Sequence, residues 1–92
     1  MPDFEIIFSR SARKELESIN NNNAQKILKK IELLAITPRP HGCEKLKGGD
    51  NLWRIRIGNY WVIYKIIEDE RLIDIAIIRH RKDAYRWKFF YK

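Results

Sequence analysis

A chain of 92 residues, 45% of them hydrophobic and 12% aromatic, has enough apolar surface for one small core and too much for a disordered segment. Its formal net charge of +7 at pH 7 favours polyanionic partners, and its single cysteine excludes an internal disulfide. We therefore expect one domain over residues 1–92, located in the reducing cytoplasm, without a membrane-spanning segment or a cofactor. His41, Cys43 and His80 are too few and too scattered to predict a metal site.

The N-terminal third of the chain predicts one strand followed by helices. Apolar and polar side chains alternate over residues 4–8, which is typical of a short strand. Ser9 or Ser11 can then cap a helix, because an apolar stripe recurs at helical spacing over residues 12–19. We expect the asparagine run at residues 20–23 to end this helix, since asparagine competes for backbone hydrogen bonds.

A second helix is predicted to begin near Asn23, because apolar residues recur at helical spacing over residues 24–34. The segment Thr37–Pro38–Arg39–Pro40 stops it, since proline lacks a backbone donor and restricts the residue before it. The side opposite the apolar stripe carries three lysines, Lys26, Lys29 and Lys30. These lysines form either a solvated face or a second RNA-contacting surface.

Residues 52–66, LWRIRIGNYWVIYKI, predict a β-hairpin with a two-residue Gly58–Asn59 turn. Closing the hairpin at this turn pairs Ile57 with Tyr60 and Arg56 with Trp61. The period of two then sorts the side chains into two faces. The apolar face holds Trp53, Ile55, Ile57, Tyr60, Val62 and Tyr64. The other face holds Arg54, Arg56, Trp61, Ile63 and Lys65.

The remaining segments complete the predicted sheet. Residues 41–47 form a linker or a short strand, and residues 47–51 have the composition of a turn. The acidic turn at 68–70 leads into a last strand over residues 72–78, and residues 79–87 form an exit segment. The expected fold is α+β in the order β-α-α-β-β-β, an antiparallel sheet with two N-terminal helices packed on one face and a short C-terminal helix or tail.

The face that the helices leave open carries the predicted chemistry. Arg54 and Arg56 would project about 6 to 7 Å apart, close to one step between backbone phosphates. Guanidinium groups bind phosphate through two parallel hydrogen bonds and remain charged at any relevant pH. Trp61 either stacks on an RNA base or is sandwiched by arginine side chains or covered by the C-terminal segment. Predicted RNA contacts are Arg54, Arg56, Trp61, Lys65, Lys47 and Lys45.

The segment EKLKGGDNLWRIRIGNYWVIYKI, followed by an acidic turn, an apolar strand and RHRKDAYR, resembles the RelE/ParE superfamily of toxins from toxin–antitoxin pairs. The most specific parts are the leucine-lysine-glycine turn, the hairpin with its Y-x-V-I-Y strand, and the H-R-x-x-x-Y ending. The likeness covers nearly the whole chain. A RelE-like member implies a metal-independent endoribonuclease that cleaves messenger RNA in the ribosomal decoding site.

The resemblance implies roles for three residues near the hairpin. Two basic residues at alternating strand positions are functional in RelE-like toxins, and they fall on Arg54 and Arg56. Some members use a glutamate before the leucine-lysine turn as general base, and Glu44 fits that place. Arginine is a very poor proton acceptor, so Glu44 is the best available base. Many active members carry an arginine directly after the hairpin tyrosine, where this chain has Trp61.

The C-terminal motif supplies the other candidate catalytic residues. The arginine near its start matches Arg79 or Arg81, and the sequence leaves both open. Tyr85 matches a tyrosine whose ring could stack on a base while its hydroxyl orients the reacting group. His80 or Arg81 would lie near the histidine that some members use as general acid.

The resemblance also implies partners and alternatives. A toxin of this kind implies a cognate antitoxin that covers the same arginines, and its substrate is mRNA on the ribosome. The first alternative is a ParE-like inhibitor of DNA gyrase, which Trp61 keeps open. The second is a toxin-like fold without catalysis that serves as a binding subunit. Codon preference, the need for the ribosome, the antitoxin family and the oligomeric state do not follow from the sequence.

Overall fold

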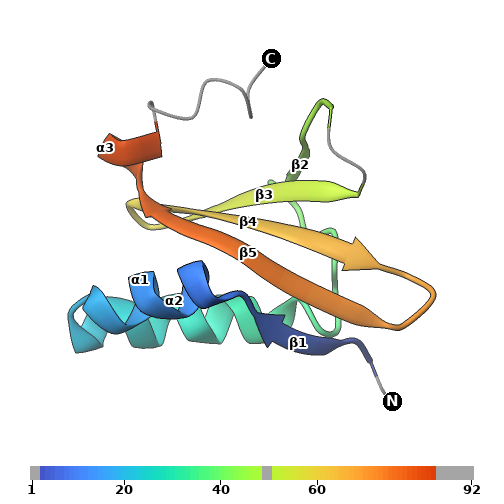
Figure 1. The fold of residues 1–92 in the computed structure, drawn as a ribbon, viewed down its shortest axis with the longest axis horizontal. Coiled ribbons are helices and arrows are strands. Elements are labelled where there is room, and N and C mark those ends of the chain that lie inside the picture. Colours follow the sequence, from blue (N-terminus) through green and yellow to red (C-terminus); the bar gives the residue numbers. More distant parts are fainter. Residues whose placement is uncertain (1–2, 49–50, 85–92) are drawn as a thin grey trace.

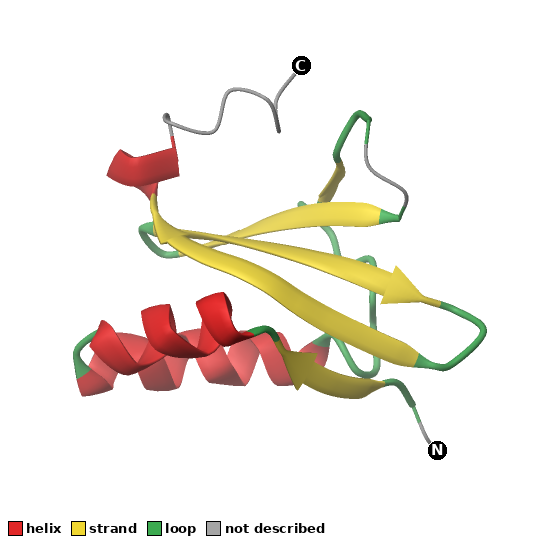
Figure 2. Ribbon diagram, viewed as in Figure 1, coloured by secondary structure: helices red, strands yellow, loops and turns green. Residues whose placement is uncertain are grey.

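The computed structural model describes residues 3–48 and 51–84, which form an α+β domain (Figures 1 and 2). Its elements are β1 (Glu5–Phe8), α1 (Arg10–Ser18), α2 (Asn21–Leu33), β2 (Glu44–Lys45), β3 (Leu52–Ile57), β4 (Tyr60–Ile67), β5 (Leu72–His80) and α3 (Arg81–Ala84). The predicted fold class and order are confirmed. The linker at 41–47 contains the short strand β2, so the strands after the helices are β2 to β5.

The five strands form one sheet in the order β1-β5-β4-β3-β2, and α1 and α2 lie together on one face of it (Figure 1). Strands β2 to β5 pair antiparallel, as predicted. Strand β1 pairs parallel with β5, with Glu5 opposite Leu72 and Phe8 opposite Ile75, so the sheet is mixed. The two helices carry the chain from β1 at one edge of the sheet across its face to β2 at the other edge. The antiparallel strands then return towards β1, so that the last strand, β5, lies beside it.

The hairpin has the predicted register. Ile57 lies opposite Tyr60, and Arg56 lies opposite Trp61. Gly58 has a φ of 60°, a left-handed conformation that glycine adopts without steric cost in such turns. The pairing of β4 with β5 shifts between Ile63 and Tyr64, which bulges β5 at Ala76.

Short polar side chains set the helix boundaries. Ser9 caps α1, because its Oγ accepts a hydrogen bond of 3.0 Å from the Ala12 backbone N–H. Asn20 caps α2 in the same way, with its Oδ1 2.9 Å from the Asn23 nitrogen. The expectation that the asparagine run ends α1 is therefore wrong, since α1 already ends at Ser18 and the asparagines begin α2.

The core lies between the helices and the sheet. Ile27 and Ile31 of α2 meet the buried β4 and β5 side chains, among which Val62, Tyr64 and Ile75 are fully buried. The Tyr64 hydroxyl donates a 2.7 Å hydrogen bond to the Pro38 carbonyl, which ties the segment after α2 to the sheet. Burial raises the pKa of the Tyr64 hydroxyl well above its usual value, so it remains a neutral donor.

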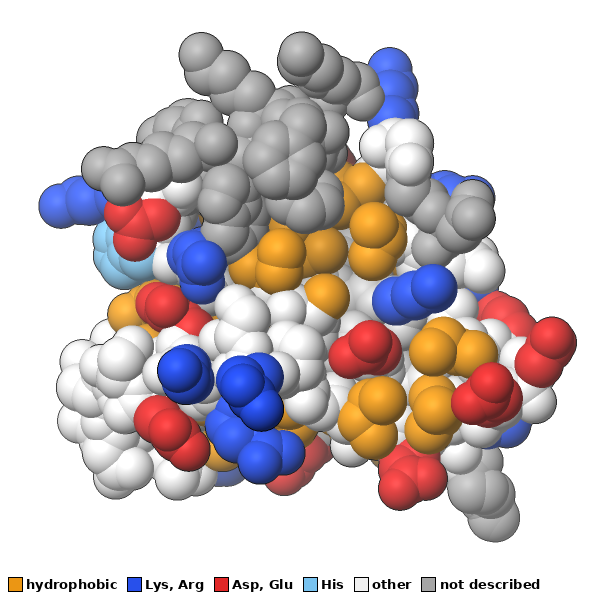
Figure 3. Space-filling view, in the orientation of Figure 1, with side chains coloured by type: hydrophobic (Ala, Val, Ile, Leu, Met, Phe, Trp, Pro, Cys, Tyr) orange, Lys and Arg blue, Asp and Glu red, His pale blue; other side chains and the backbone are white. Residues whose placement is uncertain are grey.

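Charge is unevenly spread over the surface. Lysine and arginine side chains gather over the helices on the face drawn in Figure 3, and acidic side chains gather at the end where β4 turns into β5. That turn contains Glu68, Asp69 and Glu70, all exposed. None of the helices in the described ranges is long and apolar enough to cross a membrane.

Candidate nucleic-acid interface

The face of the sheet opposite α1 and α2, called the open face below, carries the hairpin residues that the sequence placed there. Arg54 and Arg56 project from β3, and Trp61, Ile63 and Lys65 project from β4. Arg56 and Lys65 are exposed. Ile63 is only 1% exposed although it is not part of the helix-side core, so the open face is not exposed to solvent over its whole area.

Arg54 is held between two neighbours. Its Nε lies 2.9 Å from Oε1 of Glu44, and its Nη2 donates to the same oxygen. This ion pair follows from the pairing of β2 with β3, which sets Glu44 directly opposite Arg54. The Arg54 guanidinium also lies over the Trp61 ring, 4.7 Å from its centroid. The predicted base and one predicted phosphate ligand are thus in direct contact.

The Trp61 ring packs against one arginine, which agrees with part of the second of its two interpretations, a ring held between arginine side chains. The ring is half-buried, and its contact with Arg54 crosses diagonally from β4 to β3. Trp61 therefore supports an arginine from the next strand.

Arg56 lies one pleat further towards the turn. Its Nε donates to the Gly58 carbonyl at 3.0 Å, and no ion pair joins it to another described residue. Its guanidinium therefore has free donors for an anion. Lys47 is exposed just after β2. Lys45 lies opposite Trp53, whose side chain packs against the core, so strand alternation sets Lys45 on the side away from Glu44.

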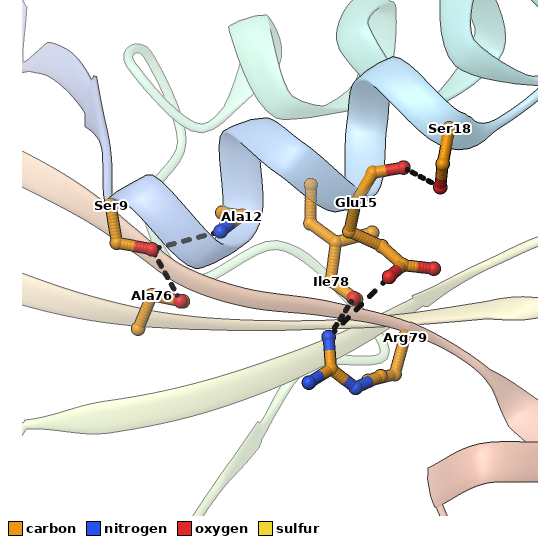
Figure 4. A network of polar contacts seen from close by, with 7 residues as sticks. All are labelled: Ser9, Ala12, Glu15, Ser18, Ala76, Ile78 and Arg79. Atoms are coloured by element: carbon orange, nitrogen blue, oxygen red, sulfur yellow. Dashed lines mark hydrogen bonds and ion pairs between the residues drawn. The ribbon is translucent and has the colours of Figure 1, made fainter.

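The candidate catalytic residues at the end of β5 point to different parts of the molecule. Arg79 lies opposite Trp61, but its Nη1 is 3.5 Å from Oε1 of Glu15 on α1, and it also donates to the Ile78 carbonyl at 3.2 Å (Figure 4). The guanidinium thus bends around the sheet edge towards α1, because β1 pairs with β5 only as far as Ile75. Glu15 is a contact that sequence patterns did not reveal, since it lies 64 residues from its partner.

His80 and Arg81 lie at the same end of the sheet but not together. The His80 ring contacts Tyr60 edge-on at 5.1 Å, and Tyr60 packs against the helix-side core. His80 is therefore on the opposite face of the sheet from Glu44. Arg81 begins α3, is exposed, and its backbone N–H donates to the Asn59 carbonyl at 2.7 Å. Tyr85 lies outside the described residues.

The arrangement can bind an anion and accept a proton at one place. Arg54 and Arg56 present two guanidinium groups on a rigid strand, and Glu44 presents a carboxylate that is 62% exposed beside them. In the described part of the chain, no group of three or more His, Cys, Asp or Glu side chains could hold a metal ion. The chemistry available around Arg54 is that of cations and the Glu44 carboxylate.

Comparisons with known proteins show the family and support the fold. The family model described as the ParE toxin of the type II toxin–antitoxin system parDE matches residues 6–85. RelE1 of Methanocaldococcus jannaschii, a toxin by name, is 33% identical over 86 residues, which cover 90% of this chain and 96% of the relative.

Solved structures give the same result. The toxin in the archaeal RelE–RelB complex from Pyrococcus horikoshii OT3 superposes with a TM-score of 0.77 at 25% identity, covering 86% of this chain and 96% of that one. The RelB–RelE antitoxin–toxin complex from Methanococcus jannaschii gives a TM-score of 0.71 at 26% identity, with 88% and 96% covered. A free variant of E. coli RelE, at 20% identity and a TM-score of 0.76, shares the fold over 98% of this chain and 94% of its own. This chain belongs to the RelE/ParE superfamily of toxins from type II toxin–antitoxin systems.

Proposed function

We propose that the protein is a ribosome-dependent mRNA endoribonuclease, acting without a metal ion in the cytoplasm. The observation that carries this proposal is the contact between Glu44 and Arg54 on the open face, one pleat from the unpaired guanidinium of Arg56. A proton acceptor beside two phosphate ligands is what cleavage by a ribose hydroxyl requires.

The proposed reaction is an internal transfer on RNA. Glu44 takes the proton from the ribose 2′-OH, whose oxygen attacks the adjacent phosphorus. The bond to the 5′-oxygen of the next nucleotide breaks, which leaves a 2′,3′-cyclic phosphate and, after protonation, a 5′-OH. Arg54 and Arg56 stabilise the negative charge that builds up on the phosphate oxygens.

Binding of the phosphate would exchange one partner of Arg54 for another. In the free protein Glu44 occupies the donors that a phosphate would use. Glu44 is largely exposed, and exposed ion pairs typically contribute only about 0–1 kcal/mol, so the exchange costs little. The Trp61 ring holds the guanidinium from its face and leaves its edge donors available. The exchange also releases the Glu44 carboxylate for its role as base.

The general acid is not assigned to one residue, and the remaining proposed contacts are lysines near the sheet. Arg79, His80, Arg81 and Tyr85 stay candidates from the resemblance, and His80 would have to act from the other side of the sheet end. Lys47 and Lys65 are proposed RNA contacts near the open face, and Lys45 one at its edge. Positioning of the message by the ribosome would supply the alignment that three side chains alone provide incompletely.

The proposed partner is a cognate antitoxin encoded by a neighbouring small reading frame. Two similar solved structures are complexes of RelE with RelB. An antitoxin that covers Arg54 and Arg56 would block phosphate binding, and acidic side chains would suit the net charge of +7. Co-expression of the two proteins should then restore growth.

Primer extension on message from cells that express the protein tests the proposal. We expect cuts within codons for the wild type and none for Arg56→Ala, with cleavage by purified protein only when ribosomes are added. Intact message in cells that stop growing would contradict it.

A ParE-like inhibitor of DNA gyrase is the second candidate. It is supported by the matching family model and by Trp61 in place of an arginine. Persistent DNA breaks with intact message in expressing cells would identify this activity. Normal growth of cells that express the protein alone would instead favour a binding subunit without catalysis.

A further inference from the structure

Arg79 can reach two sides of the sheet. Its backbone lies opposite Trp61, so strand alternation starts its side chain on the open face. Its guanidinium nevertheless turns around the edge of β5 to Glu15 on α1, with Nη1 3.5 Å from Oε1 (Figure 4). This turn is possible because β1 pairs with β5 only as far as Ile75, which leaves the end of β5 without a strand on that side in the described part of the chain.

Glu15 lies beside Arg79 because the start of α1 is anchored to β5. The Ser9 hydroxyl donates to the Ala76 carbonyl at 2.6 Å and accepts from the Ala12 backbone, which fixes the first turn of α1 on the strand. From Ser9 to Glu15 the helix rises about 9 Å. In the same direction, β5 rises about 10 Å from Ala76 to Arg79 (Figure 4). The two advances match, so the carboxylate arrives next to the guanidinium.

The contact between Glu15 and Arg79 is loose. Its 3.5 Å separation is at the outer limit of a hydrogen bond, and the two side chains are 26% and 30% exposed. Ser9 and the fully buried Ala12 already hold α1 on the sheet, so this pair adds little to the packing of the helix. An anion that approaches from solvent can therefore replace Glu15 at low cost.

The charge of Glu15 keeps Arg79 on the side of α1. Glu15 is the one carboxylate among the described residues that line a hollow of about 650 Å³ along this helix. The others are Arg10, Ser11, Lys14, Ser18 and Arg79. Without the carboxylate, the Arg79 guanidinium would share the hollow with two like charges, which would favour its return to the open face.

On the open face, Arg79 belongs to a row of three residues. Arg56, Trp61 and Arg79 lie opposite one another on β3, β4 and β5. Because adjacent strands are about 4.8 Å apart, the backbones of the two arginines are about 10 Å apart, with Trp61 between them. Guanidinium groups from both sides could then contact one phosphate above the ring, over which Arg54 already lies.

We propose that Glu15 is a positioning residue for Arg79, which it holds on α1 in the free protein and releases to an RNA phosphate on the open face when the substrate binds. The inference rests on the proposed function and makes Arg79 a substrate-binding residue. Glu15 competes with the phosphate only in the free protein. Its charge should therefore raise KM and leave kcat unchanged.

Binding of a short fluorescent 2′-O-methyl RNA tests this exchange without cleavage, because the probe lacks the attacking hydroxyl. Glu15→Gln should bind the probe about threefold more tightly, since Arg79 no longer has to leave a charged partner. Glu17→Gln is the matched control. It removes the same charge two residues away, at an exposed position that does not line the hollow, and should change the affinity far less.

Arg79→Gln completes a double-mutant cycle. Alone, it should weaken binding of the probe at least about fivefold and reduce the salt slope of log Kd by about 0.7, which corresponds to one lost phosphate contact on a single strand. In the Arg79→Gln background, Glu15→Gln should gain no more than Glu17→Gln does. With ribosome-bound message, Glu15→Gln should lower KM about threefold at unchanged kcat.

Equal affinities of Glu15→Gln and Glu17→Gln would overturn the inference, as would a gain by Glu15→Gln that persists without Arg79. So would equal losses of stability in urea for Glu15→Gln and Arg79→Gln with unchanged RNA affinity, which is the result expected of a purely structural pair. Should Arg79→Gln fail to fold, Arg79→Lys replaces it, and it should lose a smaller part of the affinity because it keeps the charge but not the planar fork.

Cleavage is scored separately from the binding cycle. No cutting of ribosome-bound message by the folded wild type would contradict the proposed function. The affinities of the four variants for the uncleavable probe would still decide whether Glu15 withholds Arg79 from RNA.

Discussion

The two faces of the sheet use the same strands for opposite purposes. On the helix side, Val62, Tyr64 and Ile66 of β4 are fully buried and hold the domain together. On the open face, the alternate positions of the same hairpin carry Arg56 and Lys65, which contact solvent. Burial on one side therefore fixes the backbone that positions charged groups on the other. Changes on the helix side should affect stability first, and changes on the open face should affect activity first.

The largest effect is expected from the helix side. Ile31→Ala removes a fully buried side chain from α2 and should lower the free energy of unfolding by about 2–5 kcal/mol. Such a loss is a large share of the stability of a small domain. Urea denaturation measures it. The control is Ile36→Ala, at a position 68% exposed, which should change stability by less than about 0.5 kcal/mol. Similar losses for both variants would argue against the described core.

Glu44→Gln should have the next largest effect, and on activity alone. The amide keeps the shape of the side chain but cannot take a proton, so we expect cleavage of ribosome-bound message to fall about 100-fold. Affinity for RNA should hold or rise, because the competitor for Arg54 loses its charge. Glu68→Gln, which breaks the exposed pair with Arg39, is the control. If the two variants cleave equally well, Glu44 is not the base.

A smaller effect on stability is expected at the start of α1. Ser9 accepts from Ala12 and donates to the Ala76 carbonyl at 2.6 Å, so Ser9→Ala removes a helix cap and a link to the β5 bulge. The expected loss is about 1–2 kcal/mol of unfolding free energy, measured in urea. Ser11→Ala should change little, since Ser11 is exposed and caps nothing. A larger loss for Ser11→Ala would reverse the assignment of the cap.

The smallest effect is expected for Trp61. Trp61→Ala removes the ring from the Arg54 guanidinium, a contact of about 0.5–1 kcal/mol, which corresponds to a two- to fivefold loss of RNA affinity. Trp61→Phe retains an aromatic face and should lose less. Fluorescence titration with a short RNA measures both. Equal affinity for the wild type and Trp61→Ala would mean that the ring does not support Arg54 during binding.

The same contrast explains how far the sequence could predict the structure. The hairpin register followed from a two-residue turn and a period of two, which are local signals, so both faces were predicted residue by residue. The parallel pairing of β1 with β5 joins segments almost 70 residues apart, and no local pattern indicates it. The asparagine run was misassigned because asparagine both ends and begins helices.

Within the candidate site, the sequence predicted which residues take part but not which residues they contact in the fold. Glu44 was named from the resemblance, and only the pairing of β2 with β3 brings it to Arg54. Arg79 faces Trp61 by register, yet its guanidinium reaches Glu15 because the edge of β5 is open beside α1. Long side chains at a sheet edge can turn to either side, and their choice depends on distant partners.

Cleavage of ribosome-bound message by the wild type and by the double variant Arg54→Ala/Arg56→Ala, both shown to be folded by urea denaturation, tests the central claim most directly. We predict that the wild type leaves 5′-OH ends within codons and that the double variant cuts at least about 100-fold more slowly at nearly equal stability. Equal cutting by the folded double variant, or no cutting by the folded wild type, would contradict the assignment of the open face as the catalytic surface.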